Sequence, residues 1–186
     1  CDQGGECELQ DLSMGYGKDY SLFDEAKRSV DDENLGPLIS TNMTRCIHCT
    51  RCVRFGSEIA GIKELGVTGR GEHSEISTYL STTLVSELSG NIIDLCPVGA
   101  LTSKPFRYRA RSWEMDKIDT IAPHDGVGSH ISLNTRRQII LRTLPNFHEP
   151  INENWISDRD RYSYLGLYED RILKPLAREN GQLIER

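Results

Sequence analysis

Six cysteines are the residues of this 186-residue chain best suited to chemistry, and their spacing is uneven. They are Cys46, Cys49 and Cys52 in a C-x2-C-x2-C run, Cys96 directly before a proline, and Cys1 and Cys7 near the start of the chain. Disulfide bonds between cysteines this close in sequence are strained, so the run favours metal ligation. Thiolates bind both zinc and iron–sulfur clusters, and the spacing must separate these two possibilities.

The spacing favours a single cubane [4Fe–4S] cluster. In bacterial ferredoxins the run is C-x2-C-x2-C-x3-C-P, and its last cysteine ligates the other cluster of a pair. Here Gly56 occupies the fourth position after the triplet, and Cys96-Pro97 supplies the C-P ending. A second triplet before Cys96 would need three more cysteines, but the chain has Ser86, Ser89 and Ile92 there. We therefore predict one complete site, with the ligands Cys46, Cys49, Cys52 and Cys96. Structural zinc, the alternative, usually takes two separated ligand pairs.

Hydrophobic spacing and turn residues predict the helices and strands that must position these cysteines. The order of these elements predicts an α+β chain of three consecutive small modules. One expected helix follows Cys52, and Ser157 is expected to begin another. Two runs with strand-like composition flank a four-residue turn, which predicts a β-hairpin. The expected elements are helices at 6–14, 53–60, 79–88 and 158–166, and hairpin strands at 127–133 and 138–144.

Composition excludes several classes of function. The formal net charge of −6 argues against a nucleic-acid-binding chain. The basic, aromatic stretch 104–111 could contact phosphates, but so close behind Cys96 it can equally tune a cluster or face a partner. No apolar run approaches the ~20 residues that span a bilayer, so we expect no direct membrane span. The chain opens at Cys1 rather than Met, and we expect it to be an internal segment of a longer protein.

Three stretches carry a family resemblance. They are Thr44-Arg45-Cys46-Ile47-His48-Cys49-Thr50-Arg51-Cys52, Gly69-Arg70-Gly71-Glu72-His73, and Ser86 through Leu101 with its Cys96-Pro97-Val98-Gly99-Ala100 ending. Together they closely resemble the large iron–sulfur subunit of respiratory complex I, the NADH:quinone oxidoreductase. In mitochondria this family is known as the 75 kDa subunit, and in bacteria as the G subunit. The resemblance extends over essentially the whole chain.

The resemblance also gives Cys1 and Cys7 a role that their spacing does not. Taken alone, they are two free thiols in a glycine-containing loop. The opening Cys-Asp-Gln-Gly-Gly-Glu-Cys resembles the family's His-Cys motif, in which one histidine and three cysteines hold a second [4Fe–4S] cluster. The resemblance implies that Cys1 and Cys7 are its last two ligands, that the other two precede Cys1, and that a [2Fe–2S] domain lies further upstream.

The same resemblance divides the chain. Residues 1–38 are expected to be the end of the His-Cys domain, and residues 39–115 a ferredoxin-like [4Fe–4S] module. Residues 116–186 are expected to begin a domain of the molybdopterin-oxidoreductase type, which in some relatives holds a further cluster. Its four ligand positions correspond here to Ala122, Asp125, Ser129 and Ser157, which cannot replace thiolates. We therefore expect this module to keep its fold and to have lost its cluster.

The implied function is electron transfer inside the proton-translocating NADH:quinone oxidoreductase, with no bond-making step in this segment. The implied partners are other subunits of the peripheral arm, including the flavin- and NADH-binding subunit and the cluster-bearing subunits downstream. The implied location is the cytoplasmic side of the bacterial inner membrane, or the mitochondrial matrix side. Two alternatives remain at this point: a subunit of an NAD-linked hydrogenase or formate dehydrogenase, and a zinc-bearing interaction module.

Overall fold

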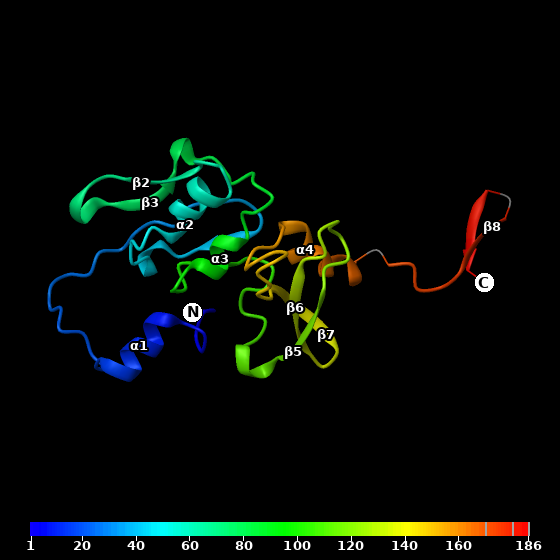
Figure 1. The fold of residues 1–186 in the computed structure, drawn as a ribbon, viewed down its shortest axis with the longest axis horizontal. Helices are drawn as coiled ribbons and strands as arrows, with labels where there is room; N and C mark the ends of the chain where they lie inside the picture. The colour runs from blue at the N-terminus through cyan, green and yellow to red at the C-terminus, as the bar shows by residue number, and fades with distance from the viewer. Residues whose placement is uncertain (170, 180, 186) are drawn as a thin grey trace.

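The computed structural model describes residues 1–169, 171–179 and 181–185. It begins with a short loop and helix α1 (Glu8–Tyr16), close to the helix expected at 6–14. A long stretch without helix or strand then leads to residue 38, and Figure 1 shows it swinging out around one side of the molecule.

The cysteine-rich part of the chain is framed by strands β1 (Ile39–Thr41) and β4 (Leu101–Ser103), which pair in antiparallel fashion. Because these strands lie on either side of the cysteine-containing stretch, their pairing closes it into one unit. Its core contains buried aliphatic and aromatic side chains from along this stretch, including Ile39, Phe55, Ile76, Ile92 and Leu101. Inside the frame are short elements: η1 (Met43–Arg45), α2 (Arg51–Arg54), η2 (Phe55–Ile59), β2 (Leu65–Thr68), η3 (Gly71–His73), β3 (Glu75–Thr78), η4 (Tyr79–Ser81) and α3 (Asn91–Leu95).

Two helix predictions in this part need revision. The helix expected at 53–60 begins earlier, at Arg51, and continues beyond Arg54 as a π-helical turn. The helix expected at 79–88 is wrong, since only a single 3-10 turn forms there. The backbone N–H of Leu84 donates instead to the carbonyl of Leu35, and that of Val85 to the carboxylate of Glu64. These long-range bonds replace helical ones. Leu84 and Leu88 pack against the core, whereas Leu80 and Val85 are exposed, so the leucine spacing does not mark one buried helix face.

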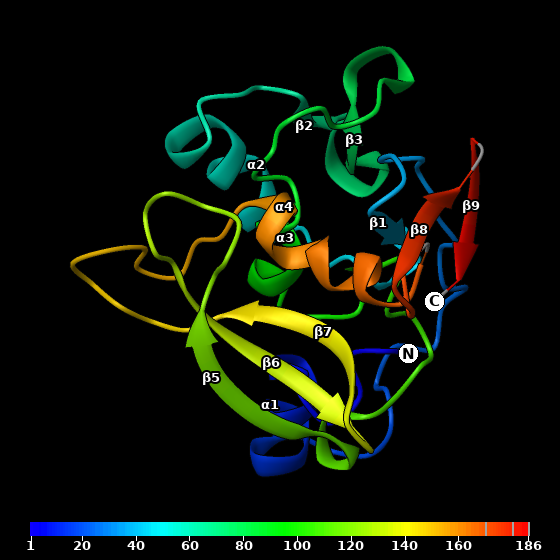
Figure 2. The same cartoon turned by 90° about the vertical axis from the view of Figure 1, so that its right-hand side faces the viewer.

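The third part is a three-stranded antiparallel sheet of β5 (Asp116–Ile121), β6 (His130–Arg136) and β7 (Ile139–Pro145), seen in Figure 2. The hairpin of β6 and β7 confirms the prediction, whereas β5 was not predicted. Helix α4 (Asp158–Tyr162) and the 3-10 turn η6 (Ser163–Leu167) follow. Ser157 begins α4 as expected, because its hydroxyl accepts a hydrogen bond from the Asp160 backbone N–H at 3.1 Å.

The β6–β7 turn stores local strain. Arg137 and Gln138 have φ angles of 50° and 66°, a region that costs non-glycine residues about 1–2 kcal/mol each. Two-residue hairpin turns with positive φ at both positions favour Asn-Gly. We therefore expect Gln138→Gly to raise the free energy of unfolding by about 1 kcal/mol in urea titrations. Thr135→Gly, inside β6, is the matched control and should lower it, and equal effects would contradict the turn assignment.

The C-terminal part forms a separate hairpin of β8 (Leu176–Glu179) and β9 (Gln182–Glu185), which Figure 1 shows far from helices α2 and α3. Within residues 1–169, 171–179 and 181–185, no helix combines the length and apolar character needed to cross a bilayer. All six cysteines lie within the first 96 residues, before the sheet and this hairpin.

Candidate functional site

The four cysteines expected to act together line one small apolar cavity of about 20 Å³. Cys46 follows η1, Cys52 lies in α2, and Cys96 directly follows α3, so three short elements bring the thiols together. Cys49 completes the lining from the loop between Cys46 and Cys52. The rest of the lining is mainly aliphatic: Met43, Ile47, Ile76, Val98, Ala100 and Leu101.

The loop that carries the triplet has an unusual backbone. His48 and Thr50, one on each side of Cys49, adopt φ angles of 51° and 61°, which non-glycine residues rarely do. This winding lets the His48 backbone N–H point at Cys46 Sγ, at 3.4 Å. Backbone N–H groups aimed at sulfur stabilise a thiolate and influence the potential of any cluster that it holds. Such strain at a candidate ligand loop is typical of a functional constraint.

The buried thiols are neutral when no metal is bound. Burial raises the pKa of Cys52 to about 12, and the neighbouring Cys96 adds to this effect. Burial also raises the pKa of Cys46, although the His48 amide opposes the shift. Because metal ligands must be thiolates, loading of the site has to release protons.

This burial makes a prediction for the cluster-free protein. Alkylation by iodoacetamide should modify exposed Cys49 at least about tenfold faster than Cys52 at pH 8, because the thiolate is the nucleophile. Peptide mass spectrometry of partly alkylated full-length protein measures both rates. Cys1, which is also exposed, provides the internal reference for a reactive thiol. Equal rates at Cys49 and Cys52 would contradict the buried geometry.

Cys1 and Cys7 both lie against the turn that follows Cys96. The Cys7 thiol donates a hydrogen bond of 3.6 Å to the Pro97 carbonyl, and Cys7 packs in one apolar cluster with Val98. A methyl group on Gly99 would collide with Cys1 Sγ. The two cysteine groups are therefore neighbours that share the residues 97–99.

One ion pair links the two cysteine groups. The Arg51 guanidinium, between Cys49 and Cys52, forms a two-pronged ion pair with Glu8 at 2.9 and 3.1 Å. Because Glu8 follows Cys7 directly, this pair bridges the two cysteine groups. No role was predicted for Arg51 from the sequence, although its place inside the triplet was a usable signal.

The basic stretch 104–111 forms hydrogen bonds with other residues of the same chain. Arg111 Nη1 donates to the Cys1 carbonyl at 2.6 Å, and the Tyr108 N–H donates to Asp2 at 2.9 Å. Lys104 Nζ donates to the Gly36 carbonyl at 3.2 Å. These side chains and backbone groups tie the N-terminal loops to the cysteine-rich part of the chain.

Three of the four positions expected to have lost a ligand lie in one turn between β5 and β6. The Ala122 N–H donates to the Ser129 carbonyl at 2.8 Å, and both residues are buried. Burial of Asp125 favours a raised pKa, but hydrogen bonds from Ser129 and from the Gly128 and Val127 amides outweigh it and lower the pKa. Ala122 packs in one cluster with Ile156, which precedes the fourth position, Ser157. The assignment of these positions to a lost cluster stays a prediction.

The sulfur arrangement also bears on the kind of metal. Within the described ranges, no three His, Cys, Asp or Glu side chains stand close enough together to hold a single metal ion. A zinc ion needs all its thiolates about 2.3 Å from one centre. In a cubane cluster each thiolate binds a different iron, so its four thiolates need not converge on one centre.

Two family profiles match the chain. Residues 36–102 match the ferredoxin-like domain of NADH-quinone oxidoreductase subunit 3. Residues 115–165 match the 4Fe-4S domain of NADH-ubiquinone oxidoreductase NDSU1/NuoG-like proteins. The fold and these matches define the class: the chain is part of an iron–sulfur protein with ferredoxin-like and 4Fe-4S domains.

Relatives specify the family. The chain is 57% identical over 182 residues to the NADH-ubiquinone oxidoreductase 75 kDa subunit of Reclinomonas americana, covering 98% of this chain and 26% of that protein. It is 54% identical over 185 residues to the NADH-quinone oxidoreductase G subunit of Rickettsia conorii, covering 100% of this chain and 28% of that protein. The chain therefore belongs to this family of large NADH-quinone oxidoreductase subunits, as its motifs indicated, and spans about a quarter of the length of these relatives.

A solved structure is similar as well. It is a crystal structure of NAD+-reducing [NiFe]-hydrogenase in the H2-reduced state, with a TM-score of 0.51 and 30% sequence identity. The match covers 59% of this chain and 48% of that chain. The matched part of the chain thus shares its fold with a chain of an NAD+-reducing hydrogenase.

Proposed function

We propose that this segment conducts electrons through [4Fe–4S] clusters as part of NADH:quinone oxidoreductase, from NADH and flavin toward quinone. The observation that carries the proposal is the convergence of Cys46, Cys49, Cys52 and Cys96 on one apolar cavity. A bound cluster supplies one-electron redox chemistry, and the chain makes or breaks no bond. The partners in this proposal are the flavin- and NADH-binding subunit and the downstream cluster-bearing subunits of a membrane-associated complex. In this proposal the segment lies on the side of the membrane that faces the bacterial cytoplasm or the mitochondrial matrix.

The residues of the chain have distinct tasks in this proposal. The four cysteines hold the cluster, and the aliphatic lining around them keeps water away. The His48 amide hydrogen-bonds a ligand sulfur, which helps to set the potential. Arg51 places positive charge near the site, and Glu8 compensates it.

We further propose that Cys1 and Cys7 supply two ligands to a second [4Fe–4S] cluster, whose other ligands, a histidine and a cysteine, come from upstream. Its support is the contact of both cysteines with residues 97–99, directly after Cys96. Adjacent clusters allow an electron to pass between them without a mobile carrier. A [2Fe–2S] cluster belongs to the upstream region in this proposal, and the module of residues 116–186 holds none.

The test uses the assembled complex. Anaerobic addition of NADH, followed by rapid freezing and electron paramagnetic resonance (EPR), should reveal reduced [4Fe–4S] signals before quinone is added. Those signals should disappear when quinone is supplied. Quinone reduction at full rate by a complex whose clusters in this subunit stay oxidised would contradict the proposal.

A second candidate is an electron-transfer subunit of an NAD-linked hydrogenase, favoured by the structural similarity to the [NiFe]-hydrogenase. The higher identity, over the whole chain, to the Rickettsia conorii NADH-quinone oxidoreductase protein favours the quinone-linked complex. Hydrogen gas separates the two, because only a hydrogenase complex would reduce the clusters with it.

A further inference from the structure

We propose that the sheet module, defined as strands β5–β7, helix α4 and residues 146–157 between them, is a clamp. It holds the two cysteine loops, which are the loop of Cys1 and Cys7 and the segment from Ser89 to Cys96, at a fixed separation through two contacts that each contain an ion pair. This inference rests on the proposed function, since it assumes that both loops bind clusters. Residues 116–165, which contain the module, include no cysteine, so they offer no thiolate of their own. Yet the module makes a buried polar contact beside one loop and a partly buried one beside the other.

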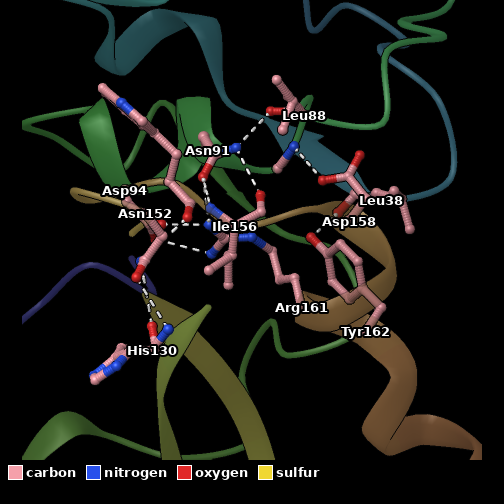
Figure 3. Close-up of polar contacts among 12 residues, drawn as sticks. Leu38, Leu88, Asn91, Asp94, His130, Asn152, Ile156, Asp158, Arg161 and Tyr162 are labelled. Atoms are coloured by element: carbon pink, nitrogen blue, oxygen red, sulfur yellow. Dashed lines mark hydrogen bonds and ion pairs between the residues drawn. The ribbon is translucent and has the colours of Figure 1, made fainter. Parts of the chain in front are cut away.

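The first contact is with α3, the helix that directly precedes Cys96. The Asn91 side chain, fully buried, donates to the Ile156 carbonyl at 2.9 Å and accepts from the Ile156 N–H at 3.1 Å. Arg161, only 4% exposed at its side chain, binds both carboxylate oxygens of Asp94 at 3.1 and 2.5 Å. Figure 3 shows these side chains converging between α3 and α4.

Asp158 strengthens the same contact. Its carboxylate accepts a hydrogen bond from the Gly90 N–H at 2.7 Å and one from the Ser89 hydroxyl at 2.6 Å. The fit at Gly90 is close, because a methyl group there would lie 2.6 Å from Asp158 Oδ1 and 2.7 Å from Arg161 Cδ. The module therefore holds the start of α3, whose end leads directly into Cys96.

The second contact is with Glu6, in the loop before Cys7. Arg142, on β7, binds both carboxylate oxygens of Glu6 at 2.6 and 2.8 Å, and its guanidinium stacks on Phe106. Arg142 and Arg161 both line the cavity of about 290 Å³ that lies between the two contacts. The sheet module therefore makes two separate contacts, one with each cysteine loop.

Hydrogen bonds within the module connect the two contacts. Asn152 accepts a hydrogen bond from the His130 N–H on β6 and donates to the Trp155 carbonyl, just before Ile156. This network, also drawn in part in Figure 3, joins the sheet to the chain that leads into α4. Movement of one contact relative to the other would have to break the hydrogen bonds of Asn152.

One direct contact between the two cysteine loops, the hydrogen bond from Cys7, is lost once clusters are bound. The hydrogen bond from Cys7 to the Pro97 carbonyl requires a thiol proton. Iron ligation removes that proton, so the donor is lost. The ion pairs of Arg142 and Arg161 need no cysteine proton and persist in the loaded protein.

The experiment uses the full-length holo-subunit with Arg142→Met, Asp158→Ala and a control, Lys117→Met. Lys117 lies on β5 and pairs within the sheet, with Asp119, at 3.6 Å. In hydrogen exchange by mass spectrometry, Asp158→Ala should speed exchange in residues 88–95 by about 10–100-fold, as expected from the lost hydrogen bonds. Arg142→Met should do the same in residues 2–8 and leave residues 88–95 unchanged. Lys117→Met should change neither.

Pulsed EPR of the two reduced clusters provides the second readout. In both clamp variants the distance distribution between the clusters should broaden or shift while both cluster signals remain. Unchanged exchange and unchanged distances would overturn the clamp. Exchange that rises throughout residues 116–165 would show a merely structural role and also overturn it. Absence of both clusters from the unaltered subunit would instead refute the proposed function.

Discussion

Replacing Cys96 with serine should remove one [4Fe–4S] cluster from the holo-subunit, a loss of about four irons, and should leave the cluster of Cys1 and Cys7 in place. A serine hydroxyl is a poor, hard ligand for iron in a cluster, and no other cysteine lines that cavity besides Cys46, Cys49 and Cys52 among the described residues. Iron analysis and EPR measure the loss.

Cys1→Ser is the matched control, because it should have the reciprocal effect on the other cluster. In the assembled complex, electron flow from NADH to quinone should fall to background in the Cys96→Ser variant. Retention of the full iron content in that variant would show that Cys96 is not a ligand.

Gly99→Ala should have the second large effect, because the new methyl group would collide with Cys1 Sγ. Gly99 is buried in the turn after Cys96, so the backbone cannot move aside without strain. We expect the cluster of Cys1 and Cys7 to be lost or destabilised, whereas the cluster of Cys46 and its partners persists. EPR of the full-length subunit distinguishes the two signals.

Gly126→Ala is the matched control for this change, since nothing lies within 4 Å of the methyl group that it adds. It should leave both clusters intact. If Gly99→Ala also left both intact, Cys1 would not hold a cluster in the observed position.

The sequence predicted the ligand set because metal chemistry imposes local spacing. Cys46, Cys49 and Cys52 need only a tight loop, and Cys96-Pro97 is a short signature. The structure brings all four cysteines to one cavity, while their role as ligands stays a prediction. The hairpin of β6 and β7 was also predictable, because two runs of strand-like composition flank a turn.

Other features depended on contacts that no local pattern reveals. The leucines of residues 79–88 have helical spacing, but hydrogen bonds from Leu84 and Val85 to distant groups prevent a helix. Strand β5, with the sequence Asp-Lys-Ile-Asp-Thr-Ile, is exposed throughout and has no apolar alternation. The buried Asn91 contact joins residues 65 positions apart, so the sequence alone could not pair them.

Anomalous X-ray scattering at the iron and zinc edges, from crystals of the full-length holo-subunit, tests the central claim most directly. We predict an iron peak enclosed by Cys46, Cys49, Cys52 and Cys96, a second one beside Cys1 and Cys7, and none among residues 116–165. A zinc peak within the four-cysteine cavity, or iron among residues 116–165, would contradict the account.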